Sequence, residues 1–131
     1  MVRKVDAQYW QEYFQTYNAK RYDDLVNNFY AEQPTFQNPK YKLAGRQAIA
    51  DFFKQQHADV NESLTPITVV ITPEVAALEL DGVLSADKDL PNFYVMPLSR
   101  GVEVKMGMAV FYHLEGDRIA HVRVYWMKPA I

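Results

Sequence analysis

The first part of the chain alternates between apolar and polar residues with the period of an α-helix. Five aromatic residues recur at spacings of three and four in the stretch 6–18, namely Tyr9, Trp10, Tyr13, Phe14 and Tyr17. This aromatic stripe predicts a first amphipathic helix with Asp6 as its N-cap. Apolar residues at i, i+3, i+4 and i+7 predict a second helix from Tyr22, which Pro34 is expected to end. The stretch 45–57 predicts a third helix.

The apolar period changes to two after the third helix. Alternation of apolar and polar residues predicts strands over 67–72, 75–85, 102–113 and 118–127. The sequence Glu115-Gly116-Asp117 predicts a hairpin turn between the last two. Three helices followed by at least four strands predict an α+β domain with a mostly antiparallel sheet.

The connection 86–101 is unusually long for a compact domain. It contains Pro91 and Pro97, yet it also carries six large apolar residues. Apolar residues in such a loop should cover something. We therefore expect either a lid over a pocket or an arm that packs on a second subunit.

Composition narrows the class of protein. The chain has 131 residues, which predicts a single domain over 1–131 with a core of its own. Aromatic residues make up 14%, which indicates either a bulky core or an aromatic-lined cavity. A net charge of −2 argues against a nucleic-acid partner. We expect no signal peptide and no membrane span, so a cytoplasmic location fits. The absence of cysteine excludes disulfides and cysteine zinc sites.

The order and spacing of several stretches carry a family resemblance. These stretches are Tyr22-Asp23-Asp24-Leu25-Val26, Thr35-Phe36-Gln37-Asn38-Pro39, the segment 45–53 with its G-x-x-A-I-x-x-F pattern, and the last two predicted strands. Together they resemble the nuclear transport factor 2-like (cystatin-like) superfamily. The loop Asp89-Leu90-Pro91-Asn92-Phe93 is similar to the SnoaL-like polyketide cyclase branch. The resemblance implies a cone-shaped, curved, mostly antiparallel sheet packed on three N-terminal helices.

The resemblance also implies a conical pocket for a small, partly apolar organic molecule. Members of the superfamily include ketosteroid isomerase, scytalone dehydratase, limonene-epoxide hydrolase and polyketide cyclases, so the fold does not settle the function. One expectation that the resemblance implies is a cyclase, isomerase or dehydratase that uses acid–base chemistry without a metal or organic cofactor. The alternative is a non-catalytic module that binds a small molecule or a second copy of itself.

Alignment with ketosteroid isomerase places Tyr13 at its active-site tyrosine, Asn38 at its base and Ala109 at its strand aspartate. An amide cannot remove a proton from carbon, and alanine cannot donate a hydrogen bond, so that mechanism is not expected here. If Ala109 faces inward, Phe111 shares its face by period two, and Val124 shares the face of Trp126. The expected pocket residues are Tyr9, Tyr13, Phe53, Tyr94, Ala109, Phe111, Val124 and Trp126.

The general base is the missing part of the expected site. His57 ends the third helix, where a positive side chain suits the helix dipole. His113 is expected on the inner face near its rim, and His121 on the outer face. The four candidates for a catalytic role are Tyr13, Asn38, His113 and Glu79. The histidines lack metal-site spacing, so no metal is expected.

Two acids alternate with leucines on a predicted strand. Glu79 and Asp81 are expected on the polar, outer face of the sheet. If the two faces are assigned the wrong way round, Glu79 becomes the best general base. The outer strip His121, Arg123, Tyr125 predicts an interface for a homodimer, which the resemblance also implies.

Overall fold

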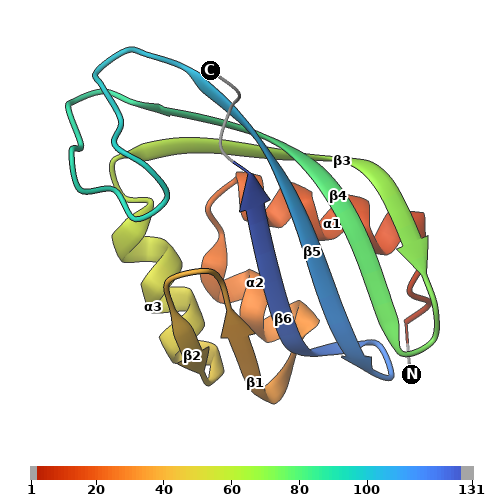
Figure 1. Cartoon of the computed structure of the whole chain (residues 1–131). Helices are drawn as coiled ribbons and strands as arrows, with labels where there is room; N and C mark the ends of the chain where they lie inside the picture. The colour runs from red at the N-terminus through yellow and green to blue at the C-terminus, as the bar shows by residue number, and fades with distance from the viewer. Residues whose placement is uncertain (1–2, 128–131) are drawn as a thin grey trace.

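The computed structural model describes residues 3–127, which form three helices and one sheet (Figure 1). The helices are α1 (Ala7–Asn18), α2 (Tyr22–Phe29) and α3 (Arg46–Gln56). The strands are β1 (Tyr30–Gln37), β2 (Lys42–Ala44), β3 (Val60–Ile71), β4 (Val75–Ala86), β5 (Val104–Glu115) and β6 (Arg118–Met127). The α+β class with three N-terminal helices is confirmed.

The six strands form one sheet in the order β2-β1-β6-β5-β4-β3. Neighbouring strands are antiparallel except β1 and β6, which run parallel. The sheet curves over α1 and α2, and the loop between β4 and β5 extends toward the end of α3 (Figure 1). The core lies between the concave face of the sheet and the three helices. This is the curved, mostly antiparallel sheet on helices that the sequence predicts.

The aromatic stripe of α1 is the face that the helix buries. The Asp6 side chain accepts a hydrogen bond from the Tyr9 backbone N–H at 3.1 Å and so caps the first turn. All five aromatic residues of the stripe are buried, and Trp10 is 1% exposed. Helix α2 ends at Phe29, and Pro34 lies inside β1, so the prediction that Pro34 ends this helix was wrong. The β1–β6 register shifts between Tyr30 and Thr35, and such an irregularity accommodates a proline.

Strand β3 begins earlier than the sequence pattern predicts. It starts at Val60 rather than at residue 67, and Val60, Glu62 and Leu64 are buried while the residues between them are exposed. A register shift between Pro66 and Thr68 interrupts the alternation along this strand. The interruption hid the first half of the strand, including the buried Glu62.

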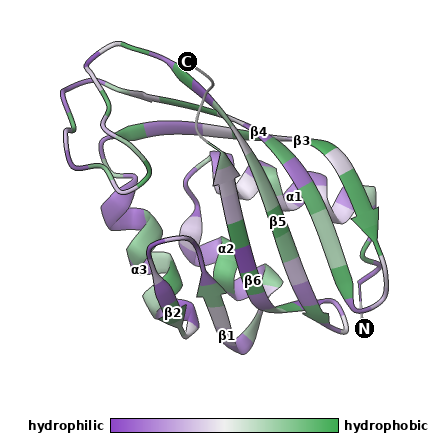
Figure 2. Ribbon diagram, in the orientation of Figure 1, coloured by the Kyte–Doolittle hydropathy of each residue, from purple (hydrophilic) through white to green (hydrophobic). Residues whose placement is uncertain are grey.

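Strands β6, β5 and β4 are neighbours in the middle of the sheet. Hydrophobic and hydrophilic residues alternate along parts of β4 and β6 (Figure 2), as expected for a sheet with one buried face. Within residues 3–127, no helix has the length and apolar character needed to cross a membrane.

Candidate functional site

A small cavity lies between the concave face of the sheet, helices α1 and α3, and the β4–β5 loop. Its accessible volume is about 40 Å³. The lining residues are Tyr17, Phe36, Asn38, Phe53, Glu62, Leu64, Tyr94, Met108, Val110, Tyr112, Val124 and Trp126. Since a drug-sized ligand occupies roughly 300 Å³ or more, this conformation of the cone is nearly filled by its own side chains.

Glu62 is the ionisable acid in the wall of this cavity. It projects inward from β3, and its side chain is only 2% exposed. The Tyr17 hydroxyl donates a hydrogen bond to its Oε1 at 2.5 Å. Among residues 3–127, Trp10 Nε1 is the only fully enclosed side-chain polar atom without a partner. The other oxygen, Oε2, makes no hydrogen bond within the described chain, and Glu62 is one of the residues that line the cavity.

Burial decides the charge of Glu62. Loss of hydration raises the pKa of its carboxyl to about 7, because a desolvated carboxylate is costly. The hydrogen bond from Tyr17 and the positive charge of Lys20 act in the opposite direction but are weaker. A carboxyl with a pKa near neutrality can both accept and return a proton, which is what general acid–base chemistry requires.

His57 lies beside Glu62 but does not carry a positive charge. Its ring is buried, and its Nδ1 lies 3.8 Å from Glu62 Oε1. Its Nε2 lies 3.0 Å from the Tyr94 hydroxyl, and its Nδ1 lies 3.3 Å from the Tyr22 hydroxyl. Burial, assisted by Lys20, lowers the pKa of His57 to about 4. The expectation of a positive side chain at the end of the third helix was therefore wrong, because the ring is desolvated and neutral.

Asn38 contributes an amide to the cavity wall. It is 5% exposed, and its Oδ1 accepts hydrogen bonds from the backbone N–H groups of Lys40 and Tyr41 at 2.9 and 2.8 Å. These bonds build the turn after β1 and orient the side chain. They leave Nδ2 as a donor for a ligand in the cavity.

Five of the residues expected at the site line this cavity together. They are Asn38, Phe53, Tyr94, Val124 and Trp126. The inward placement of Val124 and Trp126 on β6 is as predicted from their alternation with His121, Arg123 and Tyr125. A position in the cavity wall does not by itself give a residue a catalytic role.

The α1 tyrosine that lines the cavity is Tyr17, one helical turn away from the expected Tyr13. Tyr13 is buried, but its hydroxyl pairs with that of Tyr30 at 2.7 Å and the residue is not part of the cavity wall. Tyr17 occupies the wall instead. The Tyr9 hydroxyl donates to the backbone oxygen of Asp117 at 2.8 Å, near the β5–β6 hairpin. Tyr9 and Tyr13 thus pack in the core rather than line the cavity.

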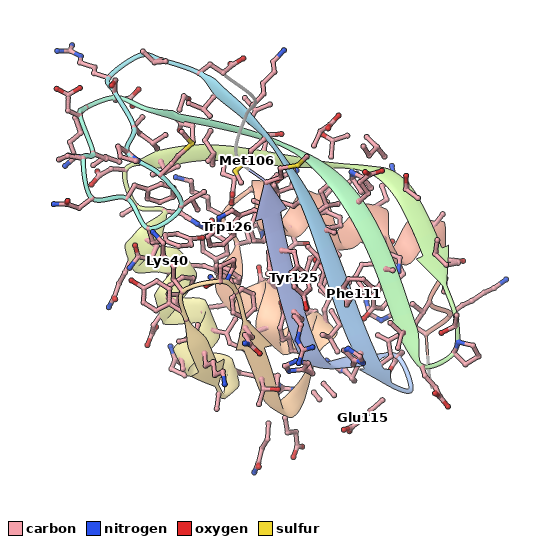
Figure 3. The ribbon with its side chains drawn as sticks, in the orientation of Figure 1. Lys40, Met106, Phe111, Glu115, Tyr125 and Trp126 are labelled. Carbon is pink, nitrogen blue, oxygen red and sulfur yellow. The ribbon has the colours of Figure 1, made fainter. Side chains whose placement is uncertain are left out.

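The inner and outer faces of β5 are the reverse of the prediction. Met108, Val110 and Tyr112 face the cavity, whereas Phe111 is 38% exposed. Ala109 pairs directly with Tyr125, and directly paired residues share a face, so Ala109 also points outward. Phe111 and Tyr125 lie side by side on the outer face, with ring centroids 6.0 Å apart (Figure 3).

His113 moves to the outer face with Ala109 and Phe111. It is exposed and pairs across the strands with His121, with ring centroids 5.5 Å apart. Glu79 is also exposed on the outer face, where it accepts a hydrogen bond from the Thr68 hydroxyl at 2.9 Å. The outward placement of Glu79 and Asp81 agrees with the sequence pattern. None of these side chains lies in the wall of the inner cavity.

Sequence reasoning missed Glu62 and Tyr17. One signal could have found Glu62, because Val60 and Leu64 flank it at period two and both are apolar. An acid at the inward position of such an alternation is a candidate for a buried carboxyl. Its contact with Tyr17 joins residues 45 positions apart and has no local signal.

The β4–β5 loop contributes Tyr94 to the wall of the cavity. Leu90 and Leu98 form an isolated bridge that closes the loop on itself. Tyr94 packs against Phe52 of α3 and against Trp126, with ring centroids 5.2 and 5.8 Å apart. The loop therefore packs on its own chain, and its roles as a lid or as a dimer arm both stay predictions.

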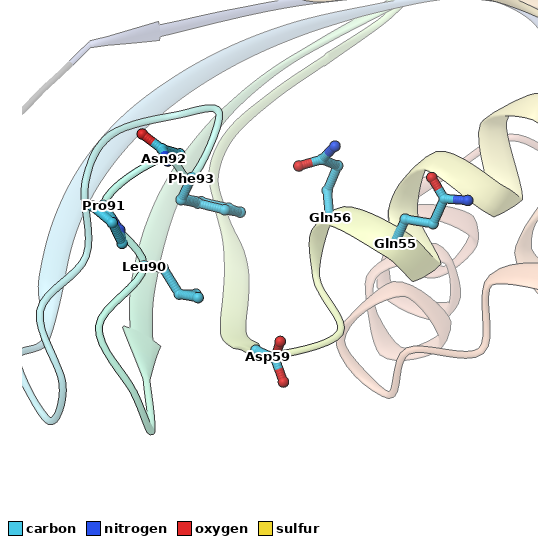
Figure 4. A pocket seen from close by; sticks show the side chains of 7 residues that line it. All are labelled: Gln55, Gln56, Asp59, Leu90, Pro91, Asn92 and Phe93. Atoms are coloured by element: carbon cyan, nitrogen blue, oxygen red, sulfur yellow. The ribbon is translucent and has the colours of Figure 1, made fainter.

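The hollows outside the cone include two of a few hundred Å³. One, of about 330 Å³, lies between the end of α3 and the loop and is lined by Gln55, Gln56, Asp59, Leu90, Pro91, Asn92 and Phe93 (Figure 4). The other, of about 370 Å³, lies on the outer sheet face and includes Glu79, Asp81 and Tyr125. Within residues 3–127, no three His, Asp or Glu side chains cluster as a metal site would require.

Solved structures with the same fold come from several bacteria. A proposed polyketide cyclase from Xanthomonas campestris is 20% identical, covers 92% of this chain and 88% of its own, and superposes with a TM-score of 0.78. A proposed polyketide cyclase from Silicibacter sp. TM1040 is 20% identical over 97% and 92%, with a TM-score of 0.78. An epoxide hydrolase resembling limonene-epoxide hydrolase, from M. tuberculosis, is 11% identical over 92% and 80%, with a TM-score of 0.70.

These identities show a common fold and no more. No curated protein sequence matches the chain. The family described as the SnoaL-like domain matches residues 10–122, which is most of the chain and runs from the first helix to the inward-facing Val122 of β6. The chain therefore belongs to the SnoaL-like domain family.

Proposed function

We propose that this protein is an acid–base enzyme in which Glu62 moves a proton on a small, partly apolar molecule held in the cone. The observation that carries the proposal is a single carboxyl with a free oxygen at an apolar cavity and a pKa of about 7. Such a group is half ionised at neutral pH, so it can take a proton from one atom and return it to another.

The neighbouring groups suit the charge that such a reaction develops. Asn38 and Tyr94 line the cavity, and a donor from either side chain would stabilise an enolate oxygen there. The reaction class is isomerisation, dehydration or aldol ring closure of a small carbonyl compound. None of these steps requires a metal or organic cofactor when a carboxyl and a donor are in place.

A deuterium-exchange assay on the wild type and on Glu62→Gln tests this proposal and does not require a known substrate. The protein is incubated in D2O with small ketones such as cyclohexanone, and exchange of the hydrogens next to the carbonyl is followed by NMR. We expect the wild type to accelerate exchange and Glu62→Gln to lose about 100-fold of that acceleration, the usual share of a general base. Glu79→Gln removes an exposed carboxyl and should exchange like the wild type. Equal exchange by the wild type and Glu62→Gln would refute the assignment.

A second candidate function is binding of a small molecule without turnover. The cavity of about 40 Å³ holds no more than a few atoms, so under either function the wall opens when a ligand enters. Under the second function a ligand binds with Glu62-dependent affinity, and no exchange is catalysed. Measuring binding and exchange on the same preparation separates the two functions.

The outer face of the sheet supports a homodimer. Large apolar side chains are exposed there, including Ile67 (54%), Val70 (55%), Phe111 (38%) and Tyr125 (49%). Contiguous exposed apolar surface of this kind commonly marks an interface. The acidic Glu79 and Asp81 on β4 and the basic Arg123 on β6 lie on the same face, so a two-fold arrangement can pair opposite charges.

A further inference from the structure

The inner cavity has an unusual balance of charge. Of its twelve lining residues, Glu62 is the one that is acidic, and the set includes no lysine, arginine or histidine. The nearest histidine, His57, is held neutral by burial. The only charge that the wall can present to a ligand is therefore negative. In a poorly hydrated site, that charge repels anions and attracts cations.

The rest of the wall is largely aromatic. Six of the lining residues carry rings, namely Tyr17, Phe36, Phe53, Tyr94, Tyr112 and Trp126. Neighbouring rings meet nearly at right angles, at 82° for Tyr17 and Phe53, 89° for Phe36 and Phe53, and 71° for Tyr94 and Trp126. Aromatic rings that meet at such angles can present their faces to a ligand from more than one side. Cations bind to such faces through the negative π-surface, and alkylated ammonium groups are recognised in this way.

We propose that the cavity is an aromatic cage for a small alkylated ammonium group, with the free oxygen of Glu62 as its counter-charge. This proposal names a class of ligand for the same cavity. It rests on the proposed function because both require Glu62 to face the ligand. An ammonium group with methyl substituents places apolar surface against the rings and its positive charge beside the carboxylate. Such a group is small but still larger than the cavity of about 40 Å³, so its admission requires the wall to open, and Tyr94, which belongs to the loop, packs against Trp126 there.

Binding of three probes of similar size and different charge tests the proposal. The probes are tetramethylammonium, the neutral tert-butanol and the anionic pivalate, titrated into the full chain by NMR at constant ionic strength. We expect tetramethylammonium to bind at least about tenfold more tightly than tert-butanol, and pivalate to bind most weakly. Tert-butanol or pivalate binding as tightly as tetramethylammonium would overturn the cage. The same holds if tetramethylammonium does not bind.

A pair of variants identifies the counter-charge. Glu62→Gln keeps the shape of the side chain and should lower the affinity for tetramethylammonium about tenfold or more, with tert-butanol affinity unchanged. Glu79→Gln, on the outer face, is the matched control and should bind like the wild type. Unchanged tetramethylammonium binding by Glu62→Gln would overturn the proposal.

The wild type alone provides a test that does not depend on a variant that folds. Tetramethylammonium keeps its charge at every pH, so any pH dependence of its binding comes from the protein. Since the pKa of Glu62 is about 7, the affinity of the protein for tetramethylammonium should rise by about tenfold from pH 6 to pH 8 as the carboxyl ionises. A fall over this range would overturn the proposal. Exchange of cyclohexanone hydrogens, measured on the same preparations, shows separately whether the proposed acid–base function stands.

Discussion

The hydroxyl of Tyr17 on α1 donates a hydrogen bond of 2.5 Å to Oε1 of Glu62 on β3. Both side chains are buried, and the bond ties the first helix to the wall of the cone. A donor on a carboxylate stabilises its charged form, whereas burial favours the neutral form. The two effects oppose each other at Glu62, and burial is the larger. The pKa of the Glu62 carboxyl lies near neutral pH as the result of these two opposing effects.

Removal of the Tyr17 hydroxyl should raise the pKa of Glu62 further. In Tyr17→Phe the burial remains and the donor is lost, so the pKa should lie above the value of about 7. NMR titration of the labelled Glu62 carboxyl carbon measures it. Tyr9→Phe removes a hydroxyl that bonds to Asp117 near the hairpin and is the matched control. A lower pKa in Tyr17→Phe would contradict the role given to this bond.

Glu62 should make the protein less stable as the pH rises. Its pKa is raised from 4.5 to about 7 on folding, so its contribution is fully present below pH 4.5 and is lost as the pH rises through 7. Glu62→Gln lacks this loss. The variant should gain stability relative to the wild type by up to about 3 kcal/mol between pH 4.5 and 7, measured by urea unfolding. A difference that does not change with pH would contradict the assignment.

His57 should have the opposite effect in nearly the same range. Its pKa falls from 6.5 to about 4 on folding, so its contribution is present above pH 6.5 and is lost as the pH falls toward 4. The slopes of Glu62 and His57 therefore offset each other in the wild type between about pH 4.5 and 6.5. His57→Gln should lose stability relative to the wild type as the pH rises over this window, in urea unfolding experiments. A loss that grows as the pH falls would contradict a neutral His57.

Substitution of adjacent residues tests the two faces of β5. Met108 is 8% exposed and faces the cavity, so Met108→Asp should cost about 3 kcal/mol or more, because it buries a carboxyl and removes apolar contacts. Ala109 pairs with the exposed Tyr125, and Ala109→Asp should cost about 1 kcal/mol or less. Urea unfolding of both variants measures the difference. A larger cost at Ala109 would mean that Ala109 is the inward residue.

A charge on the outer face should break the proposed homodimer. Tyr125 is 49% exposed at the hollow formed with Glu79 and Asp81. Light scattering should give twice the mass of one chain for the wild type and one chain for Tyr125→Glu, because a carboxylate would face apolar surface and like charge. Gln8→Glu, on the exposed side of α1, should leave the mass unchanged. A wild type with the mass of one chain would remove the proposal.

The sequence predicted the helices well and the faces of the strands less evenly. The α1 stripe has polar residues on its other side, so its buried face could be read directly. The faces of β4 and β6 were also correct, because polar and apolar residues alternate clearly there. On β5 both faces carry apolar residues, such as Phe111 outside and Val110 inside. The sequence pattern therefore does not show which face of β5 is buried. The pairing of Ala109 with Tyr125 is what decides it.

The sequence by itself determined the class of the fold, because helical and strand periods are local properties of the chain. It also placed Asn38, Phe53 and Trp126 at the cavity. Only the tertiary structure decided that Glu62 is the carboxyl at that cavity and that His57 is neutral. Both depend on burial and on partners far apart in the chain, such as Tyr17 and Tyr94. A pKa follows from the surroundings of a group, and those surroundings exist only once the sheet has closed over the helices.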